Sequence, residues 1–230
     1  MTWDEYARNP AVDAAISRLV YGLGWFYLIC ALAAAFISRL GRWGRALMVA
    51  GSIGLVFLAL AYTKARFYHF GQFFEYALQF GSPLFLIFLL KHGITDRLVL
   101  SMKIATSLTF TCHGLYAIGY YPVPGLFMSM TIHILGTDAA QTIMFLKTAG
   151  ILDFLVAVGI FLPARFSRWF LLYAVFWGAA TAAARVLGNF YWQFPLDSLH
   201  QWVYEMVYRF PHFLIPASLF LQARAQRQRG

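Results

Sequence analysis

Residues 16–37 read ISRLVYGLGWFYLICALAAAFI, and after Arg18 this stretch has no charged residue. A run of about 20 apolar residues is long enough to cross the hydrocarbon core of a bilayer as a helix. Within that core the backbone must satisfy its own hydrogen bonds, which favours helices over open strands. Residues 1–10 lack the basic start and the cleavage site of a signal peptide, so we expect this helix to be retained.

Similar apolar runs recur along the chain, which is 61% hydrophobic and only 12% charged. That charged share is about half the share in soluble domains. The runs do not alternate between apolar and polar residues, as the strands of a membrane barrel do. The sequence therefore predicts an all-α, polytopic transmembrane bundle of about seven helices. We expect these helices at about 16–37, 46–63, 75–90, 98–120, 140–162, 168–187 and from 211 onward. Because the apolar part of the last helix is short, six spans are the alternative.

Two segments between these helices are not expected to cross the membrane. The sequence Tyr121-Pro-Val-Pro-Gly125 breaks the preceding helix, because proline and glycine do not continue it. Residues 126–136 are apolar but too short to span, which predicts an interfacial or re-entrant piece. Residues 190–210 are rich in Tyr and Trp, which prefer the headgroup level of a bilayer.

The net charge of +9 comes mainly from basic residues near helix ends. Basic residues in short loops stay cytoplasmic, and these loops share one side if the N-terminus is outside and the C-terminus is cytoplasmic. Lys64 and Arg66 are exceptions to this arrangement. We expect contact with the lipid bilayer and none with nucleic acid, since no nucleic-acid-binding motif is present. The expected location is the cell membrane, as a multi-pass protein, and the inner membrane if the source is bacterial.

Polar residues recur every three or four positions on several predicted helices, so they form stripes on single faces. Ionisable groups within spans are costly and usually face the bundle or a wet cavity. These stripes predict a ligand-binding cavity in the outer half of the membrane, where the expected residues are His113, Glu75, Arg185, Tyr116, Trp192 and His69. Two alternatives are hydrogen bonding between helices without a ligand and the ordinary preference of histidine for interfaces.

Two further charged residues lie inside the predicted spans. Lys103 and Asp153 have similar expected depths, and a buried ion pair between them would lower the cost of both charges. Of the histidines only His113 lies clearly within a span, and no HxxxH or HxxE motif is present. Haem or a metal is therefore a less favoured cofactor.

From Asp96 onward the chain resembles the DoxX-like family of small four-helix membrane proteins. The resemblance rests on Phe110-Thr-Cys-His-Gly114, Ala149-Gly-Ile-Leu-Asp153 and Gly159-Ile-Phe-Leu-Pro163. Relatives more often have Glu where this chain has Asp153. The resemblance implies three parts, which are an added three-helix segment, the four-helix unit and a basic cytoplasmic tail, at 1–95, 96–222 and 223–230.

Some DoxX-like proteins are subunits of membrane oxidoreductases that pass electrons to quinone. The resemblance thus implies an accessory or quinone-interacting subunit of a redox complex, with other membrane subunits as partners. A transporter for protons or small solutes is a second hypothesis, because polar stripes also suit a pathway. A structural subunit without chemistry of its own is a third.

The topology can be tested with reporter fusions. With seven spans, a reporter fused after Gly230 should read cytoplasmic and one inserted near Asp138 should read external. The opposite result at either position would contradict the seven-helix arrangement.

Overall fold

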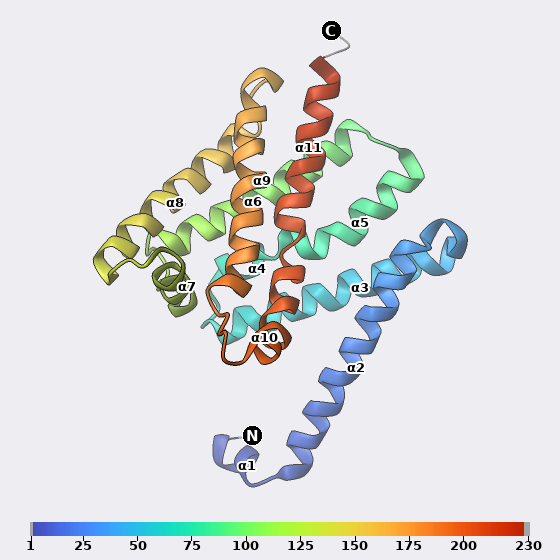
Figure 1. The fold of residues 1–230 in the computed structure, drawn as a ribbon. Coiled ribbons are helices and arrows are strands. Elements are labelled where there is room, and N and C mark those ends of the chain that lie inside the picture. Colours follow the sequence, from blue (N-terminus) through green and yellow to red (C-terminus); the bar gives the residue numbers. More distant parts are fainter. Residues whose placement is uncertain (1, 228–230) are drawn as a thin grey trace. The chain divides into compact units, whose positions relative to one another are not determined.

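The computed structural model describes residues 2–227, which form helices and turns and contain no strand (Figure 1). By their internal contacts these residues divide into two units, with the boundary between Gly54 and Leu55 inside α3. The helices are α1 (Trp3–Ala7), α2 (Pro10–Ala35), α3 (Ile37–Ala65), α4 (Phe70–Glu75), α5 (Ala77–His92), α6 (Asp96–Ala117), α7 (Gly125–Leu135), α8 (Ala139–Gly159), α9 (Ala164–Leu187), α10 (Pro195–Tyr208) and α11 (Pro211–Arg227).

Six spans are long and apolar enough to cross a membrane among the described residues. They are α2, α3, α4 with α5 as Phe70–His92, α6, α8 and α9. The chain is therefore an all-α, multi-pass membrane protein, as the sequence predicts. The helix α11 is not among these six, so a seventh crossing stays a prediction, as does the orientation of the termini.

Two helix boundaries differ from those expected. The basic segment after α2 is not a loop, because α3 already begins at Ile37 and includes Arg39 and Arg42. A kink at Gly41 (φ 55°, ψ −121°) separates the first turn from the rest of α3, in a backbone conformation that favours glycine. The span Phe70–His92 is also interrupted, because Tyr76 lies between α4 and α5 and has a non-helical backbone.

The first unit holds α1, α2 and the first part of α3. Helix α1 has a capping box, in which the Thr2 side chain accepts from the Glu5 amide and Glu5 accepts from Thr2. Where α2 meets α3, the Cys30 thiol donates to the Leu47 carbonyl over 3.6 Å. Cys30 is buried as a free thiol.

In the second unit, small residues let pairs of helices approach closely. Helices α6 and α8 cross at Gly114 and Gly150, where a Cβ on Gly150 would lie 3.0 Å from the Gly114 carbonyl oxygen and 2.8 Å from Ile118. Helices α9 and α11 pack at Gly178, where a Cβ would lie 2.6 Å from the His212 carbonyl oxygen. Small residues serve this purpose widely in membrane bundles.

The short helix α7 is bounded at both ends by residues that do not continue a helix. Pro124 precedes it, and Gly136 ends it in the left-handed conformation (φ 65°). Asp138 then caps α8 and forms a capping box with Gln141. Helix α7 packs against α8 and α9, and His133 Nδ1 contacts the Gly188 carbonyl oxygen at 2.9 Å. This helix is too short to span a membrane, in agreement with the sequence.

The crossing of α6 and α8 predicts a steric cost for Gly150→Ala. The added methyl group must displace Ala117, Ile118 or the Gly114 backbone, so the free energy of unfolding should fall by about 1–3 kcal/mol. Gly24→Ala on α2 is the matched control, because a Cβ there meets nothing within 4 Å. Alanine is the better helix former, so this control should be neutral or stabilising. Unfolding in detergent micelles measures both variants, and equal stabilities would contradict the close contact.

Candidate ligand-binding site

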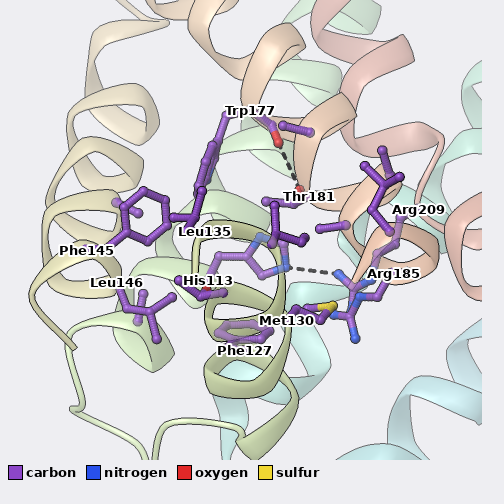
Figure 2. A pocket seen from close by; sticks show the side chains of 18 of the residues that line it. His113, Phe127, Met130, Leu135, Phe145, Leu146, Trp177, Thr181, Arg185 and Arg209 are labelled. Carbon is purple, nitrogen blue, oxygen red and sulfur yellow. Dashed lines mark hydrogen bonds between the residues drawn. The ribbon is translucent and has the colours of Figure 1, made fainter. Parts of the chain in front are cut away.

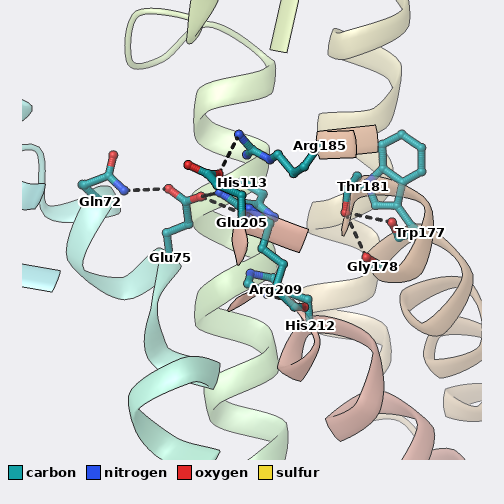
Figure 3. A network of polar contacts seen from close by, with 10 residues as sticks. All are labelled: Gln72, Glu75, His113, Trp177, Gly178, Thr181, Arg185, Glu205, Arg209 and His212. Carbon is teal, nitrogen blue, oxygen red and sulfur yellow. Dashed lines mark hydrogen bonds and ion pairs between the residues drawn. The ribbon is translucent and has the colours of Figure 1, made fainter. Parts of the chain in front are cut away.

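A buried carboxylate, that of Glu75, lies in a network of polar contacts in the second unit (Figure 3). Glu75 is only 5% exposed, and its Oε1 lies 3.0 Å from His113 Nε2 and 3.3 Å from Arg209 Nη2. Its Oε2 accepts a hydrogen bond from the Gln72 amide over 2.9 Å. Both carboxylate oxygens are therefore satisfied, and one full positive charge offsets the negative one, as a buried ion pair requires.

Three separate parts of the chain position these groups. Glu75 is the last residue of α4, directly before the interruption at Tyr76. His113 lies on the buried face of α6, one residue before the Gly114 crossing. Arg209 follows α10 as its C-terminal cap and precedes α11. The network thus forms only when the two ends of the second unit pack against its middle.

The tautomer of His113 follows from these distances. Arg209 Nη1 lies 3.4 Å from the same Nε2 atom that lies 3.0 Å from Glu75. A guanidinium has only donors, so it cannot supply the acceptor that Nε2–H needs, whereas the carboxylate can. We therefore assign the Nε2 proton to the bond with Glu75. Nδ1 of His113 makes no hydrogen bond to any described residue.

A second ion pair lies beside the first. Arg185 of α9 contacts Glu205 of α10, with Nη1 to Oε2 at 3.4 Å, and its guanidinium carbon lies 5.9 Å from the centre of the Phe127 ring. The Nε atoms of Arg185 and Arg209 are buried and have no hydrogen-bond partner within residues 2–227. With neutral histidines, two arginines and two glutamates give this cluster no net charge.

His212 adds a second imidazole to the cluster. Its ring stacks on that of His113, with centroids 5.2 Å apart and planes 5° from parallel. Its Nδ1 lies 3.1 Å from the Arg209 carbonyl oxygen and donates to it, because a carbonyl accepts only. Its buried Nε2 then carries a lone pair and has no partner in the described part of the chain.

A cavity of about 310 Å³ adjoins this cluster between α6, α7, α8 and α9 (Figure 2). Most of its wall is apolar, with Phe127 and Met130 from α7, Leu146 from α8 and Trp177 from α9 among the residues that form it. The ionisable groups in the wall are His113, Arg185, Arg209 and Asp153, and Thr131 and Thr181 add hydroxyl groups. The cavity thus joins an apolar interior to a cluster of buried hydrogen-bonding groups.

The structure brings together three of the predicted site residues. Glu75 contacts His113, and both His113 and Arg185 line the cavity. Arg185 pairs with Glu205 and not with Glu75. The role of these residues in ligand binding stays a prediction.

The other predicted site residues lie elsewhere. Tyr116 and His69 pack around Tyr121, with ring centroids 5.0 and 4.6 Å away, and neither lines the cavity. The placement of Trp192 near the cavity wall is wrong, because its side chain is 84% exposed and packs edge-on against Phe190. An interfacial position, typical of tryptophan, explains this exposure better than a site role.

The predicted ion pair between Lys103 and Asp153 is also wrong. Neither residue takes part in an ion pair among the described residues. The reason is the crossing of the antiparallel helices α6 and α8 at Gly114 and Gly150. Because the helices are antiparallel, Lys103 and Asp153 lie on the same side of that crossing. Lys103 is about three helical turns away from it and Asp153 about one turn, so roughly 12 Å of helix separates their levels.

Sequence reasoning missed Arg209, His212 and Glu205 as members of the site. Arg209 had a usable signal, since it is the only Lys or Arg between Arg185 and Arg224. A single basic residue within a long aromatic segment is a candidate partner for a buried acid. Assigning residues 190–210 to the interface as a whole hid this signal.

No protein-family model, curated protein or solved structure matches the chain. The resemblance of residues 96–222 to the DoxX-like family, and the division of the chain at 95 and 222, accordingly stay proposals. The function must be argued from the chemistry of the cluster and the cavity.

The buried network predicts a large effect for Glu75→Gln. The variant keeps the size of the side chain but leaves the Arg209 charge without its counter-ion, which typically costs about 3–5 kcal/mol. Glu205→Gln is the matched control, because the Glu205 side chain is 28% exposed and water partly screens its pair. Unfolding in detergent micelles should show the larger loss for Glu75→Gln. Equal losses would contradict the central position of the Glu75 carboxylate.

Proposed function

We propose that the cavity binds a neutral, lipid-soluble ligand with carbonyl groups, of the quinone class. In this proposal the chain is a quinone-interacting subunit of a membrane redox complex. The observation that carries the proposal is the contact between an apolar cavity and a buried cluster whose own charges already balance.

The charge balance favours a neutral ligand over an anion. The guanidinium groups of Arg185 and Arg209 already face Glu205 and Glu75. An anionic headgroup would add a negative charge that nothing in the cluster offsets, and such a charge is costly away from water. A carbonyl oxygen adds no charge and accepts from donors such as the unpartnered Nε–H groups of both arginines.

The size and lining of the cavity suit an aromatic or quinonoid ring. Its volume of about 310 Å³ is at the lower end of the range for small-molecule pockets. The rings of Phe127 and Trp177 in its wall supply flat apolar surfaces for a ring to pack against. His113 adds an imidazole whose Nδ1 has no partner among the described residues; with the proton on Nε2, its lone pair can accept from a hydroxyl group of the reduced quinol.

The role within a complex is supported by the resemblance of residues 96–222 to DoxX-like proteins, some of which are redox subunits. Reducing a quinone to a quinol consumes two electrons and two protons. In this proposal the electrons come from a partner subunit and the protons from water, and this chain contributes the binding site and the groups that hydrogen-bond the ring.

A binding experiment tests the proposal. The purified protein should retain quinone in a lipid extract, and it should bind a short-tail benzoquinone with saturable quenching of tryptophan fluorescence. His113→Ala should weaken this binding about tenfold, the equivalent of one hydrogen bond, because losing the Nε2–H bond to Glu75 disturbs the Glu75–Arg209 pair and the arginine donor beside the cavity. His200→Ala is the control, because His200 is an exposed histidine on α10 and lies away from the cavity wall.

Two results would count against quinone binding at this site. One is the absence of both extracted quinone and saturable quenching. The other is equal affinity in His113→Ala, His200→Ala and the unaltered protein, which would place any bound quinone outside the cavity.

A further inference from the structure

Asp153 is a buried carboxyl group without a hydrogen-bond or ion-pair partner among the described residues. It lies on α8, is 2% exposed and contributes to the wall of the cavity. Its Oδ1 has no hydrogen-bond partner within residues 2–227, and Asp153 forms no ion pair there. The two arginines of the site do not pair with Asp153, because Arg185 pairs with Glu205 and Arg209 pairs with Glu75.

A lone carboxylate in this position is energetically costly. Isolated charges are not stable in apolar surroundings, and such groups take up a proton instead. A protonated carboxyl group has one O–H donor as well as a carbonyl acceptor. Asp153 therefore presents to the cavity a neutral donor that has no bonding partner among the described residues.

Among the described residues, Asp153 takes no part in the hydrogen bonds and ion pairs of the charged cluster. Asp153 lies about one helical turn, or roughly 5 Å along α8, beyond the crossing of Gly150 with Gly114. His113 lies beside that crossing on α6, and Arg185 and Arg209 extend the charged cluster from there. The cavity wall thus has ionisable groups in two places, with apolar side chains such as Leu146 and Trp177 around them.

We infer that the Asp153 carboxyl group is the second hydrogen-bond donor of the site and that the ligand is a dicarbonyl compound, a para-quinone. A para-quinone ring has carbonyl oxygens on opposite edges, so one accepts from the charged cluster and the other accepts from Asp153. A ligand with a single carbonyl group would leave one of the two donors unpaired, which weakens binding. This inference rests on the proposed function and adds the class of ligand that the same cavity selects.

The binding test compares two probes and two variants. The probes are a short-tail para-benzoquinone and the matching cyclohexenone with one carbonyl group. The unaltered protein should bind the quinone about tenfold more tightly than the enone, the equivalent of one hydrogen bond to a buried donor. Asp153→Leu keeps the bulk but removes the donor, so the two affinities should become equal. Asp153→Asn restores an N–H donor and should recover most of the preference for the quinone.

Infrared spectroscopy gives a second readout that needs no ligand and no leucine variant. The unaltered protein should show the C=O band of a protonated carboxylic acid, and Asp153→Asn should remove that band. Asp197→Asn is the control, because Asp197 is exposed on α10, and it should leave the band in place.

The outcomes separate the inference from the proposed function. If the unaltered protein does not bind the quinone saturably, both are overturned. If it binds the quinone but prefers it no more than the enone, or if the acid band survives Asp153→Asn, only the role of Asp153 is overturned. Should Asp153→Leu fail to fold, the probe preference of the unaltered protein, the Asp153→Asn affinities and the acid band still decide.

Discussion

The carboxylate of Glu75 constrains the second unit more than any other group does. A buried charge among membrane-spanning helices cannot be hydrated, so the protein must supply both its counter-ion and its hydrogen bonds. His113 comes from α6 and Arg209 from the junction of α10 and α11, so one carboxylate links α4 to two distant parts of the chain. Gln72, one turn earlier on α4, donates a further hydrogen bond to this carboxylate. The stacking of His212 on His113 extends the same arrangement into α11.

Glycines at the helix crossing allow close packing, whereas large side chains next to the crossing enclose the cavity. At Gly114 and Gly150 the backbones of α6 and α8 approach each other closely, because neither has a side chain at the crossing. Next to the crossing, α7 is too short to span and lies against α8 and α9. Large side chains from α7, such as Phe127 and Met130, enclose the cavity without filling it. The shape of the site therefore depends on the close contact between α6 and α8, and its volume depends on the short helix α7.

The sequence predicted the class of fold well, because apolar runs and their breaks are local features. Residues 121–125 and 126–136 were placed correctly as a helix break and a short segment. Helical spacing also identified His113, Glu75 and Arg185 as inward-facing groups, and all three are buried. Pairing was harder to predict, because depth was judged from helix ends. Lys103 and Asp153 seem level by that measure, but the glycine crossing shifts α6 relative to α8. Arg209 was missed because its partner lies far away in sequence.

The wide separation of Glu75 and Arg209 has a consequence during synthesis. The two residues are 134 positions apart, so Glu75 leaves the ribosome long before its counter-ion exists. At typical elongation rates of roughly 5–20 residues per second, the interval is on the order of ten seconds. During that time α4 must either keep Glu75 protonated or remain beside the insertion machinery, where water is still present. The carboxylate thus reaches its final state only when the C-terminal helices arrive, which makes the binding site one of the last parts of the nascent chain to assemble.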